Sequence, residues 1–247
     1  MRHVELLGLP GSGKSTLAKE LVRNFEGAID LETAVHTAIR EHGSDDTSRR
    51  VARISGSSGR LWKAAYARST DRFDALARFV SGNSRLVEVV LSAQRDRSDR
   101  DRGQELVLGW VLNLMARFQL ASESVTNELV VIDEGFCQRG VALFGYGFGP
   151  DDQGRLDEYL EWIPMPRTLV LVETPVDVCV ERLNNRGWSE RIVGLTPDVR
   201  RGFLDTSALV ITAVSQRAES QGVAVIRVDG TEMANAAAEA VTGRLRV

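Results

Sequence analysis

Apolar residues gather along the chain in two patterns that alternate. Short apolar runs are typical of strands, and longer stretches with an apolar residue at every third or fourth position are typical of helices. The runs at 129–133 and 168–172 are almost continuous, as in strands that are buried on both faces of a sheet. This alternation favours an α/β fold in which helices cover both faces of a parallel sheet. We predict strands at His3–Leu7, Ala28–Leu31, Leu129–Asp133, Thr168–Val172 and Val223–Val228.

A long helical insertion, about residues 41–127, separates the second predicted strand from the third. Its apolar positions predict amphipathic helices around 61–80, 86–91 and 106–121. The stretch His42–Gly59 is rich in Ser, Gly, Asp and Arg, and it is predicted to be a mobile loop. Further along, Thr174-Pro175 and Thr196-Pro197 each predict a helix start, with threonine as the N-cap and proline in the first turn.

Composition narrows the class of protein. The 247 residues are enough for one domain, 1–247, with a full core, and the apolar runs are too short to span a membrane. The first predicted strand begins so early that we expect no signal peptide. The 2 cysteines form no C-x-x-C pair, and the 3 histidines form no metal-ligand cluster in the sequence. A reduced, cytoplasmic location follows as the expectation.

The net charge of −3 conceals an uneven distribution. Residues 49–102 hold 13 Arg or Lys against 6 Asp or Glu. Such a block suits an anionic partner, but it is equally typical of a solvated helical face. Because acidic residues are interspersed, nucleic acid is a less fitting partner than a small phosphorylated ligand.

The most informative segment is Gly8-Leu9-Pro10-Gly11-Ser12-Gly13-Lys14-Ser15-Thr16, which follows the first predicted strand. It fits G-x-x-x-x-G-K-[ST], in which glycines let successive backbone N–H groups point at phosphate oxygens. The helix after it adds the positive end of its dipole. Lys14 supplies a charge for the terminal phosphates, and the Ser15 hydroxyl suits Mg²⁺. The segment therefore predicts a phosphate-binding loop.

Carboxylates follow two of the predicted strands. Asp133 and Glu134 end the third strand, where an acid in phosphate-loop proteins holds Mg²⁺ and a second acid accepts a proton from a nucleophile. An ordinary polar strand end is the alternative. Asp30 closes the second strand, so it should face the same crevice at the carboxyl edge of the sheet. It either orients an acceptor hydroxyl or caps the helix that begins near Thr33.

Arginines gather in the segment 180–191. Arg182 and Arg186 are four positions apart, on one face of a predicted helix end, and Arg191 lies in the loop beyond. Guanidinium groups suit a transferring phosphoryl group because they carry permanent charge and forked donors. On its own, the cluster is equally typical of a surface helix whose basic residues complement its dipole.

The chain resembles the P-loop nucleoside and nucleotide kinase family, and most of all its thymidylate-kinase-like branch. The resemblance is carried by the loop from Gly8 to Thr16, by Glu181-Arg182-Leu183-x-x-Arg186-Gly187 and by Val225–Thr231. It spans roughly residues 1–40 and 128–247.

This resemblance implies a three-layer P-loop NTPase fold with strand order 2-3-1-4-5, and ATP with Mg²⁺ as the phosphoryl donor. It implies a lid at about 184–195 whose arginines, with Lys14, carry transition-state charge. Together with the carboxylates at the end of the third predicted strand, this gives the candidate catalytic residues Lys14, Asp133, Glu134, Arg182, Arg186 and Arg191. Nucleotide contacts fall on Gly8, Pro10, Gly11, Ser12, Gly13, Lys14, Ser15, Thr16, Arg182, Asp229 and Gly230, and metal contacts on Ser15 and Asp133.

Two departures from the branch bear on the acceptor. Leu7 stands where thymidylate kinases carry an acid before the loop, and the segment Asp133–Arg139 replaces their Asp-Arg-Tyr or Asp-Arg-Phe pattern. We therefore do not expect thymidylate to be the acceptor on the basis of the resemblance. The candidate acceptor contacts are Asp30, Arg95, Gln138 and Arg139.

The leading hypothesis is an ATP-dependent kinase for a small-molecule acceptor: a nucleoside, a nucleotide or another hydroxyl or phosphate compound. An NTP-hydrolysing switch is the alternative, since an acid after the metal-binding Asp commonly activates water, and a catalytically idle nucleotide-binding regulator is a third.

Trp110, Trp162 and the stretch 143–148 are candidates for an exposed apolar patch suited to a homodimer. The alternative for 143–148 is a wall of the acceptor pocket or plain core.

Overall fold

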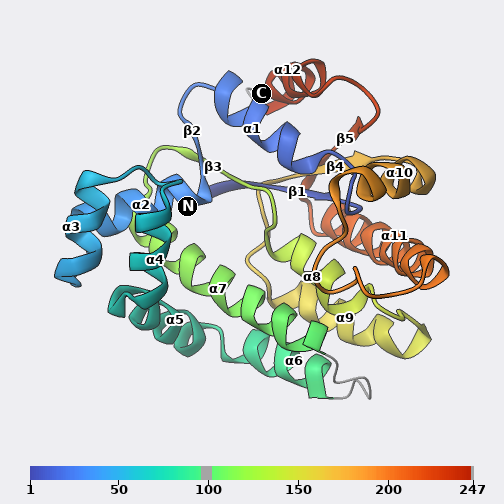
Figure 1. The fold of residues 1–247 in the computed structure, drawn as a ribbon, viewed down its shortest axis with the longest axis horizontal. Helices are drawn as coiled ribbons and strands as arrows, with labels where there is room; N and C mark the ends of the chain where they lie inside the picture. The colour runs from blue at the N-terminus through green and yellow to red at the C-terminus, as the bar shows by residue number, and fades with distance from the viewer. Residues whose placement is uncertain (96–101, 246–247) are drawn as a thin grey trace.

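The computed structural model describes residues 1–95 and 102–245, and its centre is a five-stranded sheet (Figure 1). All of the strand pairs are parallel and the order is β2-β3-β1-β4-β5. The predicted α/β fold and strand order are confirmed, and no strand end differs from the prediction by more than one residue. The strands are β1 (Arg2–Gly8), β2 (Ala28–Asp30), β3 (Leu129–Ile132), β4 (Thr168–Glu173) and β5 (Ala224–Asp229).

Side chains of the strands alternate between two hydrophobic cores. In β3, Val131 packs into a core with α1 (Lys14–Asn24) and α12 (Ala234–Leu245), whereas Val130 and Ile132 pack into the core on the opposite face. The period of two sends successive side chains to opposite faces of the sheet. This explains the continuous apolar runs, because both faces are covered by helices.

The larger core lies between the sheet and the remaining helices, which form most of the molecule below the sheet in Figure 1. The helices of this core include α2 (Leu31–His42), α7 (Arg102–Ser124), α8 (Phe136–Phe144), α9 (Pro150–Trp162), α10 (Val176–Arg186) and α11 (Pro197–Ser220), and the helices between α2 and α7 also contribute side chains to it.

The insertion after β2 is helical, as predicted, but two of its details differ. The predicted loop His42–Gly59 contains a helix, α3 (Asp46–Ile54), whose N-cap Asp45 accepts hydrogen bonds from Thr47 N and Ser48 N. The helix predicted around 61–80 is two helices, α4 (Arg60–Arg68) and α5 (Thr70–Gly82).

The break between α4 and α5 falls at Ser69, whose hydroxyl accepts a hydrogen bond from Asp71 N. Capping by short polar side chains thus overrides the continuous apolar pattern here, and it also starts α3. The remaining helix before α7 is α6 (Ser84–Arg95).

The two predicted Thr-Pro helix starts have different outcomes. Thr196 is the N-cap of α11 and Pro197 lies in its first turn, as predicted. The α10 prediction was wrong by one position, because Pro175 is the N-cap and Thr174 lies outside the helix. The Thr174 hydroxyl instead donates to Ser12 O at 3.1 Å, which ties β4 to the loop after β1.

The predicted apolar patch does not form as one surface. Leu143 and Phe144 belong to the core, Trp110 is half-buried, and Trp162 is exposed at 46%. The homodimer remains a prediction, and the structure provides no continuous apolar patch among these residues for its interface. Within residues 1–95 and 102–245, no helix combines the length and the apolar character needed to cross a membrane.

Candidate functional site

The loop between β1 and α1 has the backbone shape that its glycines predict. Gly11 and Gly13 have φ of 86° and 100°, in the left-handed region that favours glycine. A Cβ on Gly11 would also meet Cys179 O at 2.9 Å, so position 11 is closed to a side chain for two reasons. The loop wraps the N-terminus of α1, where free N–H groups and the helix dipole favour an anion.

Lys14 lies inside this loop. Its Nζ donates to Gly8 O at 2.7 Å and to Leu9 O at 2.8 Å. Burial lowers the pKa of Lys14 to about 8, although Asp133 and Glu134 act in the opposite direction. Lys14 is thus a buried cation held by carbonyl oxygens, beside the amides that would face a phosphate.

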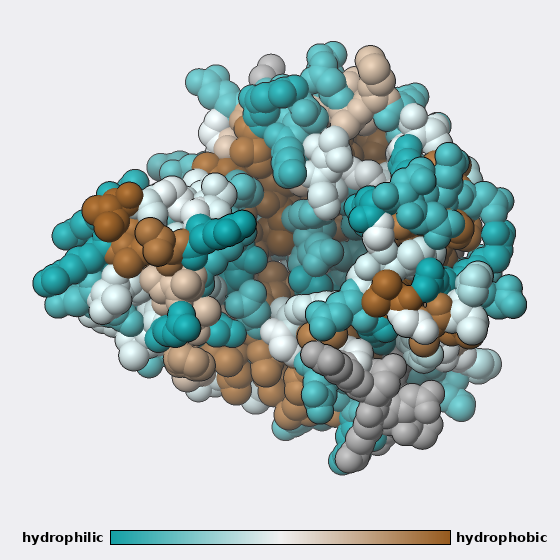
Figure 2. Space-filling model, in the orientation of Figure 1, coloured by the Kyte–Doolittle hydropathy of each residue, from teal (hydrophilic) through white to brown (hydrophobic). Residues whose placement is uncertain are grey.

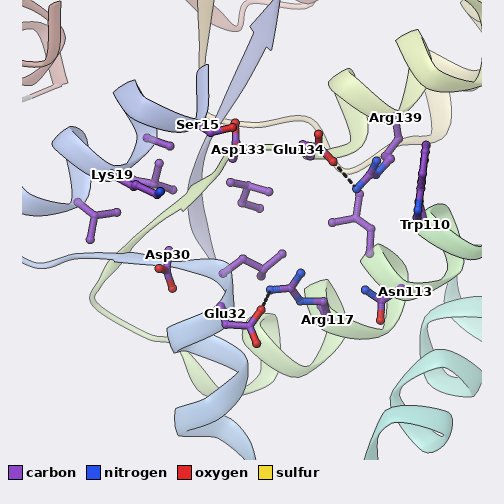
Figure 3. A pocket seen from close by; sticks show the side chains of 16 residues that line it. Ser15, Lys19, Asp30, Glu32, Trp110, Asn113, Arg117, Asp133, Glu134 and Arg139 are labelled. Carbon is purple, nitrogen blue, oxygen red and sulfur yellow. Dashed lines mark hydrogen bonds and ion pairs between the residues drawn. The ribbon is translucent and has the colours of Figure 1, made fainter. Parts of the chain in front are cut away.

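Asp133, directly after β3, lies next to Ser15 at the start of α1 (Figure 3). Burial raises the pKa of Asp133, and a hydrogen bond with Ser15 partly offsets this effect. Its Oδ1 atom is buried without a hydrogen-bond partner among the described residues. An orphaned carboxylate oxygen beside a hydroxyl fits the oxygen ligands of Mg²⁺, which takes few protein ligands when phosphates supply the others.

Glu134 points away from Asp133 toward α8 (Figure 3). It forms an ion pair with Arg139 at 2.8 Å, and the Arg139 guanidinium lies 5.5 Å from the ring centroid of Trp110 on α7. The end of β3 and helix α7, which are consecutive elements of the chain, thereby hold one arginine between them.

Gln138 is buried on α8, and its Oε1 accepts a hydrogen bond from Gly8 N at 3.1 Å. Glu5, a fully buried acid in the middle of β1, fixes the start of α8. Its carboxylate accepts hydrogen bonds from Phe136 N and Cys137 N. Sequence reasoning missed Glu5. Its position as the single acid inside the predicted strand His3–Leu7 was a signal for a buried, functional or structural carboxylate.

Arg182 joins the loop to the opposite side of the site. Its Nη1 donates to Gly230 O at 3.0 Å, and at 3.3 and 3.4 Å to Gly11 O and Ser12 O. A cavity of about 480 Å³ lies beside these contacts and is lined by Asp229 and Gly230. The structure thus brings together the loop, Arg182 and the segment after β5, as the sequence predicted.

The segment 184–195 borders a second cavity of about 220 Å³ over the phosphate loop. Arg186 at the end of α10 and Arg191 beyond it both line this cavity. Arg191 also donates to Ala142 O at 2.7 Å and lies over the rings of Tyr146 and Phe203.

A third cavity of about 450 Å³ opens between α1, α2, α7 and the end of β3, and Figure 2 shows the molecule hollowed at its centre. It shares Ser15, Trp110, Glu134 and Arg139 with the cavity over the loop, so the two adjoin.

Asp30 lines this third cavity and also accepts from Thr33 N at 2.6 Å as the N-cap of α2. The structure thus shows the capping role of Asp30, and its place in the cavity wall leaves the role toward an acceptor hydroxyl as a prediction. Arg95 ends α6, is exposed, and lines none of these three cavities.

Several residues of this third cavity were missed. Glu32 accepts from Arg117 at 2.7 Å and from Trp62 Nε1 at 3.1 Å, and Asn113 lies between Trp110 and Arg117 on α7 (Figure 3). A partial signal existed, because Asn113 and Arg117 flank the apolar face of the predicted helix 106–121. The partner of Arg117 on α2, Glu32, could not be found from spacing.

Comparison with known proteins gives results that agree with this architecture. The AAA domain family matches residues 4–194. No curated protein matches the sequence. The structure of deoxyadenosine kinase from M. mycoides with bound dATP is similar, with a TM-score of 0.51 at 11% sequence identity, over 99% of this chain and 100% of that chain.

A second structure of deoxyadenosine kinase from M. mycoides, with the products dCMP and a flexible dCDP, gives a TM-score of 0.50 at 10% identity, over 99% of this chain and 98% of that one. At these identities the likeness concerns the fold. The chain belongs to the AAA domain family and has the fold of a P-loop kinase.

Proposed function

We propose that the protein is an ATP-dependent phosphotransferase that moves the γ-phosphoryl group of ATP to a small-molecule acceptor. The observation that carries this proposal is the continuity of the site. The phosphate loop with Lys14 and Asp133 opens directly onto the 450 Å³ cavity, and Asp30 and Glu134 line that cavity. A cavity of this size takes a molecule of about the size of a nucleoside or sugar.

In this proposal the donor lies along the loop. Backbone N–H groups at the end of the loop, those of Gly13, Lys14 and Ser15, hold the phosphates, and the Lys14 ammonium neutralises the charge of the terminal phosphates. Ser15 and Asp133 would hold Mg²⁺, which supplies charge neutralisation when it is bound. The purine would occupy the 480 Å³ cavity beside Arg182, Asp229 and Gly230.

Lid arginines complete the donor side. Arg186 and Arg191 line the cavity over the loop, where phosphoryl transfer would take place. We propose that the segment 184–195 closes on the nucleotide, excludes water and brings guanidinium charge to the transferring group. Arg182, by contrast, braces the loop through carbonyl contacts.

On the acceptor side, Glu134 or Asp30 would position the acceptor and take its proton. Gln138 and Arg139 line the cavity over the loop, and we propose that they contact the acceptor there. The fold that this chain shares with deoxyadenosine kinase places nucleosides among the first acceptors to test. Thymidylate-like nucleotides belong to the same panel.

The test is ATP consumption with and without nucleosides, nucleotides, sugars and aminoglycosides. We expect at least one acceptor class to stimulate ADP formation. Lys14→Ala should lower turnover by about 10²- to 10³-fold while the protein stays folded. Lys63→Ala, a change at an exposed lysine on α4, is the matched control and should leave turnover unchanged. Full activity of Lys14→Ala would contradict the assignment of the loop.

A second candidate is an NTP-hydrolysing switch, favoured by the match to the AAA domain family and by the acid that follows Asp133. Substantial ATPase activity without any acceptor would support it. Tight ATP binding with negligible turnover on every acceptor would instead support a non-catalytic regulator.

A further inference from the structure

Helix α7 presents one continuous face to the acceptor cavity, the 450 Å³ cavity that adjoins the phosphate loop. Trp110, Asn113, Leu114 and Arg117 line it at spacings of three and four residues, which place side chains on one side of a helix. Figure 3 shows Trp110 and Asn113 beside each other and Arg117 one turn further along. This face lies opposite Ser15 and Asp133, so it contacts whatever receives the phosphoryl group.

The charge of Arg117 is already compensated. Its guanidinium donates to Glu32 at 2.7 Å, and the same carboxylate is fixed from behind by Trp62 Nε1 at 3.1 Å. Trp62 is fully buried in α4. Glu32 is therefore held on two sides, and Arg117 faces the cavity as one half of an ion pair.

Arg139, the second guanidinium of the wall, is compensated in the same way. It pairs with Glu134 at 2.8 Å and lies over Trp110, and its side chain is only 14% exposed. Its Nε atom is buried without a hydrogen-bond partner among the described residues. Arg139 thus borders the cavity as the cationic half of a second ion pair.

The remaining charges of the wall are mostly negative. Asp30 and Asp133 add two carboxylates, and Lys19 adds one exposed cation on α1. Among the described residues that line this cavity, both guanidinium groups are paired, so a phosphate or carboxylate on the acceptor would meet only paired arginines and would lie near Asp30. Like charges at close range in a partly desolvated site are strongly unfavourable.

We infer that the acceptor is a hydroxyl compound without phosphate or carboxylate groups, and that Asn113 and the Glu32–Arg117 pair determine this specificity. The inference rests on the proposed phosphotransferase function. A bond forms between the acceptor oxygen and the γ-phosphorus, and the bond from the γ-phosphorus to the β,γ-bridging oxygen breaks. The hydroxyl proton passes to Asp30 or Glu134, and the products are ADP and a phosphate monoester.

The first test compares acceptors in pairs that differ only by a phosphate: thymidine and thymidine monophosphate, deoxyadenosine and deoxyadenosine monophosphate, glucose and glucose 6-phosphate. We expect the unphosphorylated member of an accepted pair to have a kcat/KM at least about 100-fold higher. A preference for the phosphorylated member overturns the inference. If no compound of any pair is phosphorylated although ATP binds, the proposed function itself fails.

A second test is independent of turnover. The phosphate loop is filled with a non-hydrolysed ATP analogue and Mg²⁺, and inorganic sulfate is then titrated while tryptophan fluorescence is followed. Glu32→Gln leaves Arg117 uncompensated, yet the amide oxygen still accepts from Trp62, so the fold is retained. We expect this variant to bind sulfate about 10-fold more tightly than the wild type.

The matched control is Glu123→Gln, which breaks an ion pair of the same kind between α7 and Arg78 on α5, outside the acceptor cavity. It should leave sulfate affinity at the wild-type value. Equal sulfate affinity for the wild type and Glu32→Gln, or tighter binding by the wild type, overturns the inference.

Discussion

The carboxylate of Glu5 occupies the space in which a side chain at Gly135 would begin. A Cβ on Gly135 would come within 2.2 Å of Glu5 Cδ, and within 2.5 Å of both carboxylate oxygens. Glu5 uses this closeness to accept hydrogen bonds from Phe136 N at 3.0 Å and Cys137 N at 2.8 Å. The free amides at the start of α8 are thus satisfied by an acid from β1, which fixes the helix that carries Gln138 and Arg139.

Gly135→Ala should therefore destabilise the protein. The added methyl group collides with a carboxylate that is fully buried and cannot move away without losing two hydrogen bonds. We expect a loss of about 1 to 3 kcal/mol in the free energy of unfolding, measured with urea. Gly154→Ala is the matched control, since a Cβ there meets nothing within 4 Å and alanine favours the helix α9. Equal stability of the two variants would contradict the coupling of Glu5 to Gly135.

Nucleotide binding should be accompanied by proton uptake in mildly alkaline solution. Burial lowers the pKa of Lys14 from 10.5 to about 8, so at pH 8 to 9 much of the nucleotide-free protein carries a neutral Lys14. Bound phosphates favour the ammonium form and draw in a proton. Calorimetry of ATP binding in buffers of different ionisation enthalpy measures this uptake, which should fall toward zero near pH 6.5.

The same pKa sets the direction of a stability change. Between pH 8 and 10.5 the unfolded chain holds more protons at Lys14 than the folded protein, so this residue's contribution to stability rises with pH in that window and is lost as the pH falls through 8. Lys14→Ala should remove both the proton uptake and this contribution. Unchanged uptake in that variant would place the titrating group elsewhere.

Asp133→Asn should separate stability from activity. Burial disfavours the charged form of Asp133 and its Oδ1 lacks a partner among the described residues, so a neutral amide should leave the melting temperature of the nucleotide-free protein unchanged or higher. Turnover with Mg²⁺ and ATP should fall by at least about 10²-fold. Asp205→Asn, at an exposed position on α11, should change neither quantity. A large loss of stability in Asp133→Asn would show that the carboxylate is structural.

Arg182→Lys should weaken nucleotide binding more than it slows transfer. Arg182 contacts the carbonyl oxygens of Gly11, Ser12 and Gly230 through Nη1 alone, and the lysine side chain is one bond shorter, so its ammonium cannot reach all three oxygens. We expect the Kd of a non-hydrolysed ATP analogue to rise about 10-fold, equivalent to the loss of one or two hydrogen bonds. Arg201→Lys, at an exposed ion pair with Asp177, is the control. If kcat falls and the Kd does not change, Arg182 contacts the transferring group instead.

The sequence predicted the sheet because its signals are local. Apolar runs such as 129–132 and 168–172 are buried on both faces, and the five strands lie where these runs lie. The sequence pattern predicted helix boundaries less accurately than strands. Asp45 and Ser69 start helices that the apolar pattern did not predict, since one polar side chain at a helix end outweighs a continuous hydrophobic stripe.

By itself, the sequence determined the phosphate loop, because Gly11, Gly13, Lys14 and Ser15 act through backbone dihedrals and a helix start that nearest neighbours define. Tertiary structure alone decided the acceptor cavity. The Glu32–Arg117 pair joins positions 85 residues apart, and Glu5 meets the start of α8 across 131 residues. Such contacts depend on how helices pack against the sheet, and no local spacing rule encodes that packing.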